Sequence, residues 1–459
     1  MRAKLSKLTP DPKQEKAIAK IISEPTRAAL NASLMGTGKT VMGVEVALRM
    51  GVKTALIIAP LNTYWGWYDT LMRQTEYQAD GIRKIDSSTK GKQAYRDLAS
   101  GVDGWYFIGR EYFRMKEWYK IVPDIALVDE CHFAQNRKSK SFKVLKQLKP
   151  RFKLSMSGTP FGNKFEGFWA VSRWLWADDK IVDRSFWKWV EKWASTRYNP
   201  FSGVEVVGEL KPGAFAKSLP CYVRLEPDYN IDMVEEVRYV DLVPAQRKIY
   251  KQFEKDLVVW LKENPLVAEV PVAARIRLRQ MTLAVPSLRD DGSVWFDEDA
   301  VSTKYKALIE IIEDHPEDKM LILTDSQIYA KIVTDRLNKR EAESAFEWSG
   351  KASQKQREEA KGRFINGSMK YIVAVIPAIA EGVDGLQDVC STVVWLSHSD
   401  SNILNQQVLD RIRRRGQKQV VNVYDIIARD TFDEGQLDSL VQTQLSMNAS
   451  LKEGTSDSN

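Results

Sequence analysis

Short, almost wholly apolar segments alternate with amphipathic ones in the first third of the chain and again in its last third. In the first region the apolar segments cover residues 55–60, 124–130 and 153–158. After position 302, an amphipathic stretch is followed by apolar segments at 319–326, 371–377, 392–397 and 420–427. Apolar strands that alternate with helices are typical of a parallel sheet covered on both faces. The pattern therefore predicts the α/β class, with two separate parallel-sheet units.

The alternation breaks off in the middle of the chain. From about residue 161 to residue 280 the sequence is helical, aromatic and irregular, with runs such as WLWADD and FWKWVEKW. The stretch after Met447 is polar and reads NASLKEGTSDSN. We expect a helical middle region between the two α/β units, and a flexible tail.

Composition excludes several classes of protein. With 459 residues, of which 44% are hydrophobic and 28% charged, the chain suits two or three globular domains. No apolar run reaches the roughly 18 to 20 residues of a membrane helix, and the first residues lack the apolar segment of a signal peptide. Cys131, Cys221 and Cys390 are far apart, so zinc sites and disulfide frameworks are not expected. These features predict a protein of a reducing, intracellular compartment.

The balance of charges narrows the choice of partner only slightly. A formal net charge of +7 suits a polyanion such as nucleic acid. The same excess of lysine and arginine also fits a well-solvated surface, so charge alone leaves both interpretations open.

The stretch ASLMGTGKT at residues 32–40 ends like a phosphate-binding loop, although the usual G-x-x-x-x-G-K-[ST] would place a glycine at Ser33. A strand-like segment precedes it and an amphipathic helix follows, which is the context that such a loop requires. Its glycines would let backbone N–H groups face phosphate oxygens, Lys39 would neutralise the β and γ phosphates, and the Thr40 hydroxyl would bind Mg²⁺. The predicted nucleotide contacts in this loop are Met35, Gly36, Thr37, Gly38, Lys39 and Thr40. A chance GKT in a flexible loop is the alternative.

The segment IALVDECH brings two carboxylates to the end of an apolar strand, where α/β sheets bind ligands. Asp129 would bind Mg²⁺, and Glu130 would orient and deprotonate the attacking water. An exposed acidic loop is the alternative. Cys131 is expected to fill a small buried space, and His132 to make a local polar contact.

Two further segments complete a set of four. The turn SMSGTP at 155–160 can sense a γ phosphate, although it also reads as an ordinary turn. In QVLDRIRRRGQ, Arg411 and Arg414 are three residues apart, so on a helix they would share one face. An arginine presented to a bound triphosphate contributes about 10³ to 10⁵ in rate, whereas the alternative is a basic face in solvent or on nucleic acid. The occurrence of all four segments in this order favours a nucleotide-hydrolysing site.

These segments resemble the motifs of helicase superfamily two, and within it the Swi/Snf-type DNA translocases, from about Leu8 to Met447. LTPDPKQ resembles the adenine-recognition motif, with Gln14 as the base-reading residue. ASLMGTGKT resembles A-D-E-M-G-L-G-K-T, which also lacks the first glycine; Ser33 and Leu34 replace its Asp and Glu. DECH stands for D-E-A-H, and LSMSGTPFGNKFEGFW is similar to L-x-x-T-G-T-P-x-x-N-x-x-x-E-x-W.

Other segments extend the resemblance along the chain. ALIIAPLNTYWGW resembles A-P-x-x-x-x-x-x-W, which in the family contacts one DNA strand. VDLVPAQRKIY and LRQMTLAVP resemble parts of the helical middle of the Swi/Snf group. IAEGVDGL resembles the motif whose Gly382 and Asp384 couple nucleotide to DNA. QVLDRIRRRGQ matches Q-x-x-D-R-x-x-R-x-G-Q, with Arg411 and Arg414 facing the nucleotide and Arg413 in place of a histidine.

The resemblance implies two RecA-like lobes with ATP between them. The implied parts are lobe 1 over 1–225 with a helical insertion from about 161, a helical linker region over 226–301, lobe 2 over 302–447 and the flexible tail over 448–459. ATP and Mg²⁺ are the implied cofactors, with Thr40 and Asp129 as metal ligands. The implied catalytic residues are Lys39, Asp129, Glu130, Arg411 and Arg414.

The implied activity is ATP-driven movement on duplex DNA, with remodelling of branched DNA by branch migration or fork reversal in replication, recombination or repair. DNA contacts would be mainly to the backbone with little sequence preference, and we expect a monomer with no membrane partner. Without chromatin-reading modules, the chain resembles bacteriophage and bacterial members of the family. This resemblance implies that the protein acts in the cytoplasm of a bacterial or phage-infected cell. The alternatives are conventional 3′ to 5′ strand separation, a nucleotide-gated scaffold that binds DNA without moving, and action on RNA.

The segment SLRDDGSVWFDED at 287–299 carries a strong turn signal, in which Gly292 follows Asp291. We therefore predict a hairpin that includes Val294, Trp295 and Phe296. Its aromatic side chains either pack on the helical middle or protrude as a wedge that stacks on bases at a branch point.

Overall fold

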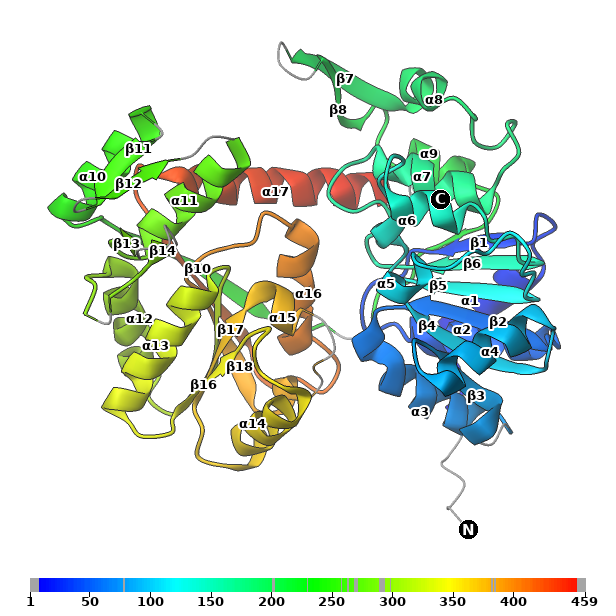
Figure 1. Cartoon of the computed structure of the whole chain (residues 1–459), viewed down its shortest axis with the longest axis horizontal. Helices are drawn as coiled ribbons and strands as arrows, with labels where there is room; N and C mark the ends of the chain where they lie inside the picture. Colours follow the sequence, from blue (N-terminus) through cyan, green and yellow to red (C-terminus); the bar gives the residue numbers. More distant parts are fainter. Residues whose placement is uncertain are drawn as a thin grey trace, which may run out of the picture. The chain divides into compact units, whose positions relative to one another are not determined.

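The computed structural model describes residues 8–451, apart from short gaps at 77–78, 200–202, 229, 257, 262–263, 268–270, 289–293, 298, 381–382 and 384. The chain divides into two units (Figure 1), of which the first comprises Met1–Asp228 and Thr443–Asn459 and the second Tyr229–Gln442. In the described parts of the chain, no helix is long and apolar enough to cross a membrane.

The first unit is built on a parallel sheet of seven strands in the order β3-β4-β2-β5-β6-β1-β9. Its strands are β1 (Ala28–Asn31), β2 (Thr54–Ala59), β3 (Ile82–Ile85), β4 (Gly104–Gly109), β5 (Ile125–Asp129), β6 (Phe152–Met156) and β9 (Tyr222–Val223). Its first helices are α1 (Pro12–Ile22), α2 (Lys39–Arg49), α3 (Tyr64–Gln74), α4 (Thr89–Ala99), α5 (Arg110–Phe113) and α6 (Lys140–Leu145). Strands β2 and β4 are buried along their whole length, so both faces of the sheet are covered. The three strands expected in this region are confirmed as β2, β5 and β6.

The insertion after residue 161 contains an antiparallel hairpin that the sequence did not reveal. Its elements are α7 (Gly167–Leu175), α8 (Phe186–Trp193), β7 (Ala194–Asn199), β8 (Gly203–Glu209) and α9 (Ala214–Ser218). The buried carboxylate of Glu209 accepts hydrogen bonds from the N–H groups of Gly213 at 2.9 Å and Phe215 at 2.7 Å, which fixes the hairpin against the start of α9. Because glycine and glutamate interrupt the valines of β8, its sequence lacks the unbroken apolar run of a central strand.

The second unit holds a parallel sheet of six strands in the order β10-β19-β18-β15-β17-β16. Its strands are β10 (Met233–Val240), β15 (Lys319–Thr324), β16 (Ala345–Trp348), β17 (Tyr371–Val375), β18 (Cys390–Trp395) and β19 (Val421–Ala428). Its helices include α10 (Pro244–Asp256), α11 (Pro271–Leu283), α12 (Thr303–Asp314), α13 (Gln327–Arg340), α14 (Gln354–Asn366), α15 (Ile376–Ile379) and α16 (Asn402–Ile412). Helix α17 (Phe432–Leu451) begins in this unit, and its residues from Thr443 onward belong to the first. A small pair of strands, β11 (Val258–Leu261) and β12 (Asn264–Val267), follows α10. The four strands expected after position 302 are confirmed as β15, β17, β18 and β19.

The edge strand β10 lies in the region 226–301, which was expected to be a helical linker. It pairs in parallel with β19 along its whole length. Its side chains are exposed or half-buried, because an edge strand is covered less than a central one. The expectation of a wholly helical linker is therefore wrong here: this region begins with a strand that completes the sheet of the second unit.

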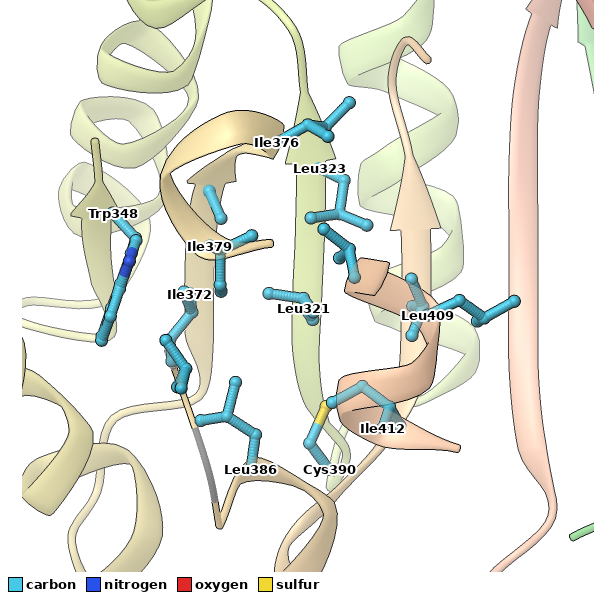
Figure 2. Close-up of a cluster of buried hydrophobic side chains, with 14 of the residues drawn as sticks. Leu321, Leu323, Trp348, Ile372, Ile376, Ile379, Leu386, Cys390, Leu409 and Ile412 are labelled. Atoms are coloured by element: carbon cyan, nitrogen blue, oxygen red, sulfur yellow. The ribbon is translucent and has the colours of Figure 1, made fainter. Parts of the chain in front are cut away.

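Alternate residues of the central strand β15 face two different hydrophobic clusters. Leu321 and Leu323 pack in one cluster together with Ile372 of β17, as Figure 2 shows. The intervening Met320 and Ile322 belong to a second cluster. All five side chains are fully buried, and burying each contributes about 1.5 to 3 kcal/mol. The run that looked apolar throughout is therefore a strand with a core on each face.

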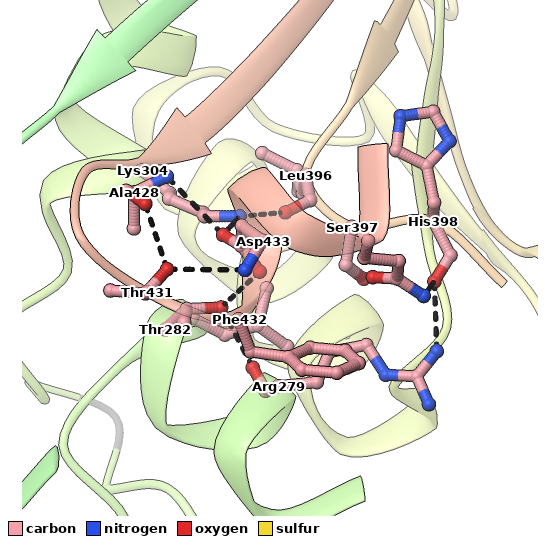
Figure 3. A network of polar contacts seen from close by, with 12 residues as sticks. Arg279, Thr282, Lys304, Leu396, Ser397, His398, Ala428, Thr431, Phe432 and Asp433 are labelled. Carbon is pink, nitrogen blue, oxygen red and sulfur yellow. Dashed lines mark hydrogen bonds and ion pairs between the residues drawn. The ribbon is translucent and has the colours of Figure 1, made fainter. Parts of the chain in front are cut away.

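A buried ion pair joins the start of the last helix to the rest of the second unit (Figure 3). Lys304 of α12 is fully buried, and its Nζ lies 2.6 Å from Oδ2 of Asp433 in the first turn of α17. Nζ also donates to the Leu396 carbonyl after β18. Asp433 further accepts hydrogen bonds from the Thr282 hydroxyl and the Ala428 N–H. The pair thus ties four elements together at one buried point.

Helix α17 continues past residue 448, the predicted start of the tail. Ser450 and Leu451 are buried, and the Tyr222 hydroxyl donates to the Leu451 carbonyl at 2.8 Å. The predicted boundary at 448 is therefore too early, because these last helical residues still pack against the first unit's sheet. Residues 452–459 lie outside the described residues.

The hairpin expected at 287–299 is present as β13 (Ser287–Leu288), which pairs antiparallel with β14 (Val294–Trp295). Its turn, with Asp291 and Gly292, lies outside the described residues. Phe296 is fully buried, and its ring meets the ring of Tyr329 edge-on at 5.9 Å. Phe296 therefore belongs to the core of the second unit, and the wedge hypothesis is left with the half-buried Trp295.

Candidate active site

The loop between β1 and α2 has the backbone of an anion-binding loop. Gly36 and Gly38 have φ angles of +76° and +75°, a left-handed conformation that glycine adopts without strain. Gly38 is the N-cap of α2 and offers no side chain to its first N–H groups. Those N–H groups, and the positive end of the helix dipole, therefore remain for an anionic ligand.

Lys39 is folded back onto this loop. Its Nζ donates to the carbonyls of Ser33 at 2.9 Å and Leu34 at 3.0 Å. The Thr37 hydroxyl also donates to the Leu34 carbonyl, at 2.7 Å. The loop thus holds the predicted phosphate-binding lysine on its concave side, where it satisfies carbonyl oxygens.

Ser33 explains the departure from the expected loop sequence. It is fully buried, and its hydroxyl accepts a hydrogen bond from the Leu225 N–H at 3.0 Å. The Leu34 N–H donates to the Leu225 carbonyl, also at 3.0 Å. A small hydroxyl residue here anchors the chain after β9 against the loop. Neither a glycine nor a buried carboxylate at this position would replace the serine hydroxyl equally well.

Gln14 joins the first helix to the same loop. Asp11 and Gln14 form a reciprocal capping box at the start of α1. The Gln14 side-chain amide also donates to the Thr37 carbonyl at 2.9 Å. A Cβ atom at Gly38 would lie 2.5 Å from Gln14 Nε2, so glycine is needed for this approach. The contact places Gln14 beside the loop, while its reading of adenine stays a prediction.

The two carboxylates of DECH stand at the carboxyl end of β5, beside a tryptophan. Trp67, which is 2% exposed, donates its indole N–H to Asp129 Oδ2 at 3.1 Å. Glu130 has a φ angle of +47°, a left-handed backbone conformation that is uncommon outside glycine. The family resemblance assigns the Trp67 segment to DNA contact and does not predict this bond. A buried indole N–H needs an acceptor, and that is the signal that could have found it.

The SMSGTP turn meets DECH through Ser157. The Ser157 hydroxyl donates to Glu130 Oε2 at 2.8 Å, and His132 Nδ1 lies 3.2 Å from the Ser157 oxygen and 3.3 Å from Glu130 Oε2. The SMSGTP turn is therefore hydrogen-bonded to the DECH segment, while its sensing of a γ phosphate stays a prediction. Cys131 is buried, with Sγ 3.9 Å from the Pro160 carbonyl, and fills a small space as expected.

The pKa values of the two carboxylates are shifted in opposite directions. Burial, and then the neighbouring Glu130 carboxylate, raise the pKa of Asp129, while the Lys39 charge opposes them. Burial also acts to raise the pKa of Glu130, but the hydrogen bond and charge of His132, with the Lys39 charge, lower it overall. Lys39 thus lies within electrostatic reach of both carboxylates, although they are about 90 residues further along the chain.

The donor set suits a magnesium ion that is shared with phosphates. The Asp129 carboxylate and the Thr40 hydroxyl at the start of α2 are hard oxygen ligands of the kind that Mg²⁺ prefers. Among the described residues, no group of three or more histidine, cysteine, aspartate or glutamate side chains could hold a metal by itself. The residues therefore fit a nucleotide-bound magnesium ion, and they do not form an all-protein metal centre.

The predicted residues of the second unit lie on and beyond α16. Arg411 is half-buried in this helix, and its Nη2 donates to the Ala380 carbonyl at 2.9 Å, next to the predicted coupling motif. The helix ends at Ile412, because Arg413 has left the helical region with a ψ angle of +70°. The expectation that Arg411 and Arg414 share one helix face is therefore wrong, since Arg414 follows in a turn. Gly382 and Asp384 lie outside the described residues.

Two family models match the chain. The chain matches the SNF2-related domain over residues 18–282, and the helicase conserved C-terminal domain over residues 303–416. The chain belongs to the SNF2-related family. Both matches confirm the resemblance to the Swi/Snf-type members of helicase superfamily two that was read from its motifs.

Two relatives align with most of this SNF2-related chain. It is 24% identical over 463 residues to the ISWI chromatin-remodeling complex ATPase ISW1 of Saccharomyces cerevisiae, with 94% of this chain and 40% of the relative covered. It is 23% identical over 422 residues to the uncharacterized ATP-dependent helicase MG018 of Mycoplasma genitalium, with 88% and 38% covered. The chain thus spans about two fifths of the length of these relatives. The Sulfolobus solfataricus SWI2/SNF2 ATPase core in complex with dsDNA is 20% identical, with 97% of this chain and 94% of that chain covered and a TM-score of 0.42.

Proposed function

We propose that this SNF2-related ATPase hydrolyses ATP at the loop 33–40 and the Asp129–Glu130 pair, and that hydrolysis drives movement along duplex DNA. The observation that carries the hydrolytic part is the meeting of three separate segments. Glu130 accepts a hydrogen bond from Ser157, and the Lys39 charge acts on both carboxylates. A base, a phosphate-binding cation and a γ-phosphate-sensing turn are thereby gathered in one unit.

Each residue then has a defined part in the reaction. When phosphates bind, Lys39 exchanges the carbonyls of Ser33 and Leu34 for phosphate oxygens. Asp129, held by Trp67, and Thr40 are the residues that would hold Mg²⁺, which supplies charge neutralisation at the phosphates. Glu130 orients the water and takes its proton, and its lowered pKa keeps it ionised beforehand.

The second unit would contribute Arg411 and Arg414 to the transition state, in line with the family resemblance. Gly382 and Asp384 would couple nucleotide state to DNA. Arg411 already contacts the backbone at Ala380, beside that motif, which supports a link between the two roles. A guanidinium that reaches the triphosphate only in a closed state contributes to the rate and little to ground-state binding.

Movement on duplex DNA, with branch migration and fork reversal, is the finer part of the proposal. The names of the relatives, an ATP-dependent helicase and a chromatin-remodeling ATPase, support ATP-driven action on DNA. The net charge of +7 supports a polyanionic track. We propose action as a monomer in the cytoplasm of a bacterial or phage-infected cell, with backbone contacts and little sequence preference.

Steady-state ATP hydrolysis with single-stranded, duplex, forked and four-way DNA, and with duplex RNA, tests this proposal. Stimulation by duplex and branched DNA is expected to exceed stimulation by single strands. A preference for single strands would favour conventional 3′ to 5′ strand separation, and a preference for RNA would contradict the choice of track.

A further inference from the structure

A cavity of about 510 Å³ lies in the first unit, where the segment that follows DECH meets the segment that follows SMSGTP. Gln135, Arg137 and Lys138 line it from the first segment, and Asn163 and Lys164 from the second. Phe186, at the start of α8, closes one side. None of these residues belongs to the nucleotide contacts assigned above.

The cavity carries uncompensated positive charge. Its lining holds three cations, Arg137, Lys138 and Lys164, against the single carboxylate of Glu166. None of the three cations has an ion-pair partner within the described part of the chain. A concave surface with unpaired cations concentrates positive potential, so the favoured ligand is an anion.

Two polar groups of the lining are already placed for a ligand. The Arg137 guanidinium lies over the Phe186 ring, 4.2 Å from its centroid, and this contact holds the charge in position. The side-chain oxygen of Asn163 is buried and has no hydrogen-bond partner among the described residues. A rotated Asn163 amide can equally present its NH₂ group, so it can serve an anion or a bridging water.

The walls of the cavity are mechanically linked to the catalytic carboxylate. The Gln135 side chain occupies the space that a Cβ atom would take at Gly162, and it also lies against Gly167. The Gln135 N–H donates to the carbonyl of His132, and the Gly162 N–H to that of Thr159. The two interlocked segments therefore follow directly on Glu130 and Ser157, which are hydrogen-bonded to each other.

We propose that this cavity binds a backbone phosphate of the DNA track and transmits its presence to Glu130 through the two interlocked segments. The inference rests on the proposed function for the identity of the polyanion. A phosphodiester fits because it carries one charge with acceptor-only oxygens, opposite three donors. A cavity of about 510 Å³ also has room for the adjoining sugars. The site gives the enzyme a direct means to hydrolyse ATP faster on DNA than off it.

The test uses Arg137→Gln, Lys164→Ala and the double variant, with blunt duplex DNA as the probe. Lys143→Ala is the matched control, because this exposed lysine lies on the neighbouring helix α6 and outside the cavity lining. Hydrolysis without DNA is expected to stay at the wild-type rate in all four. The duplex concentration for half-maximal stimulation should rise about tenfold in the double variant. The slope of the logarithm of the binding constant against the logarithm of salt concentration should correspond to about one phosphate contact fewer. Arg137→Lys should behave closer to wild type, because it keeps the charge.

Gln135→Ala separates transmission from binding. Because Gln135 acts through the two segments and carries no charge, its loss is expected to lower the maximal stimulation and leave the half-saturating duplex concentration unchanged. A fall in hydrolysis without DNA to the same degree would mean that Gln135 only supports the fold of the site, and would overturn the transmission step.

Other outcomes overturn the proposal. The double variant could keep the wild-type half-saturating duplex concentration and salt dependence at an unchanged melting temperature. That result would show that the cavity does not bind a DNA phosphate. Binding of inorganic phosphate to the wild type but not to the double variant, with duplex DNA leaving that binding unchanged, would assign the cavity to free phosphate. If no DNA stimulates the wild type, the proposed function fails, but equilibrium duplex binding of the same variants still decides whether the cavity holds a backbone phosphate.

Discussion

The indole nitrogen of Trp67 lies 3.1 Å from Oδ2 of Asp129, and this bond joins two motifs that are 62 residues apart. Burial raises the pKa of Asp129, and the indole hydrogen bond works in the opposite direction by stabilising the ionised form. Trp67 therefore acts as a positioning residue for the carboxylate that would hold Mg²⁺. An aromatic residue from a motif assigned to DNA thus contacts the proposed nucleotide site.

Replacing Trp67 with Phe should lower ATP turnover about tenfold and raise the magnesium concentration needed for half-maximal rate. The ring volume is largely kept, but a hydrogen bond to a charged group, worth about 1.5 to 3 kcal/mol, is lost. Magnesium titrations of the ATPase rate check the prediction. Trp65→Phe is the control, because Trp65 lies on the same helix and is 58% exposed. An unchanged magnesium dependence in Trp67→Phe would show that Trp67 does not position the carboxylate of Asp129.

Glu130→Gln should bind ATP and DNA normally but hydrolyse ATP about 10² to 10⁴ times more slowly, because glutamine keeps the shape and cannot take a proton. Single-turnover hydrolysis and equilibrium nucleotide binding measure the two effects separately. Ser157→Ala removes only the hydrogen bond to Glu130 Oε2 and should give a smaller loss of rate. Weaker ATP binding in Glu130→Gln would assign the carboxylate to binding.

Arg414→Ala should lower the maximal rate by about 10³ to 10⁵ while changing ATP affinity little, since its contact belongs to the closed state. Arg411→Ala should show a similar split. Arg415→Ala is the control, because this neighbouring arginine is exposed and is assigned no role. A loss of affinity without a loss of maximal rate would make Arg414 a ground-state contact.

Asp433→Asn should destabilise the second unit by about 3 to 5 kcal/mol, because the fully buried Lys304 ammonium loses its charged partner. Denaturant unfolding followed by tryptophan fluorescence measures the loss. Adding Lys304→Met should recover part of it, since the unpaired charge is then gone. Asp438→Asn, which changes an exposed aspartate of the same helix, should be neutral. Equal stability of Asp433→Asn and Asp438→Asn would contradict the importance of the buried pair.

Local chemistry explains what could be predicted from the sequence. The left-handed backbone at Gly36 and Gly38 needs glycine, so the spacing of these glycines is enough to predict the loop. The central strands bury both faces, and their unbroken apolar runs gave correct positions for β2, β15 and β17. Lys39, Asp129 and Glu130 could be proposed from the sequence because each belongs to a short segment whose expected function depends on residues close in sequence.

Features that depend on distant partners were missed. The bond from Trp67 to Asp129 and the packing of Gln135 against Gly162 arise only when separate segments meet. Strand β10 is recognisable only by its pairing with β19, since its own side chains are largely uncovered. The end of α16 at Ile412 was missed as well, because a run of arginines is compatible with helix and turn alike.

Displacement of a third strand from a DNA triplex tests the central claim most directly, because it requires movement along duplex DNA and does not require the duplex strands to separate. The wild type is expected to displace the third strand only with hydrolysable ATP. Lys39→Ala, which removes the phosphate-binding charge, should bind the triplex and leave it intact, with hydrolysis reduced at least about 10²-fold. Duplex-stimulated hydrolysis by the wild type without any displacement would contradict translocation and would identify a nucleotide-gated DNA-binding scaffold.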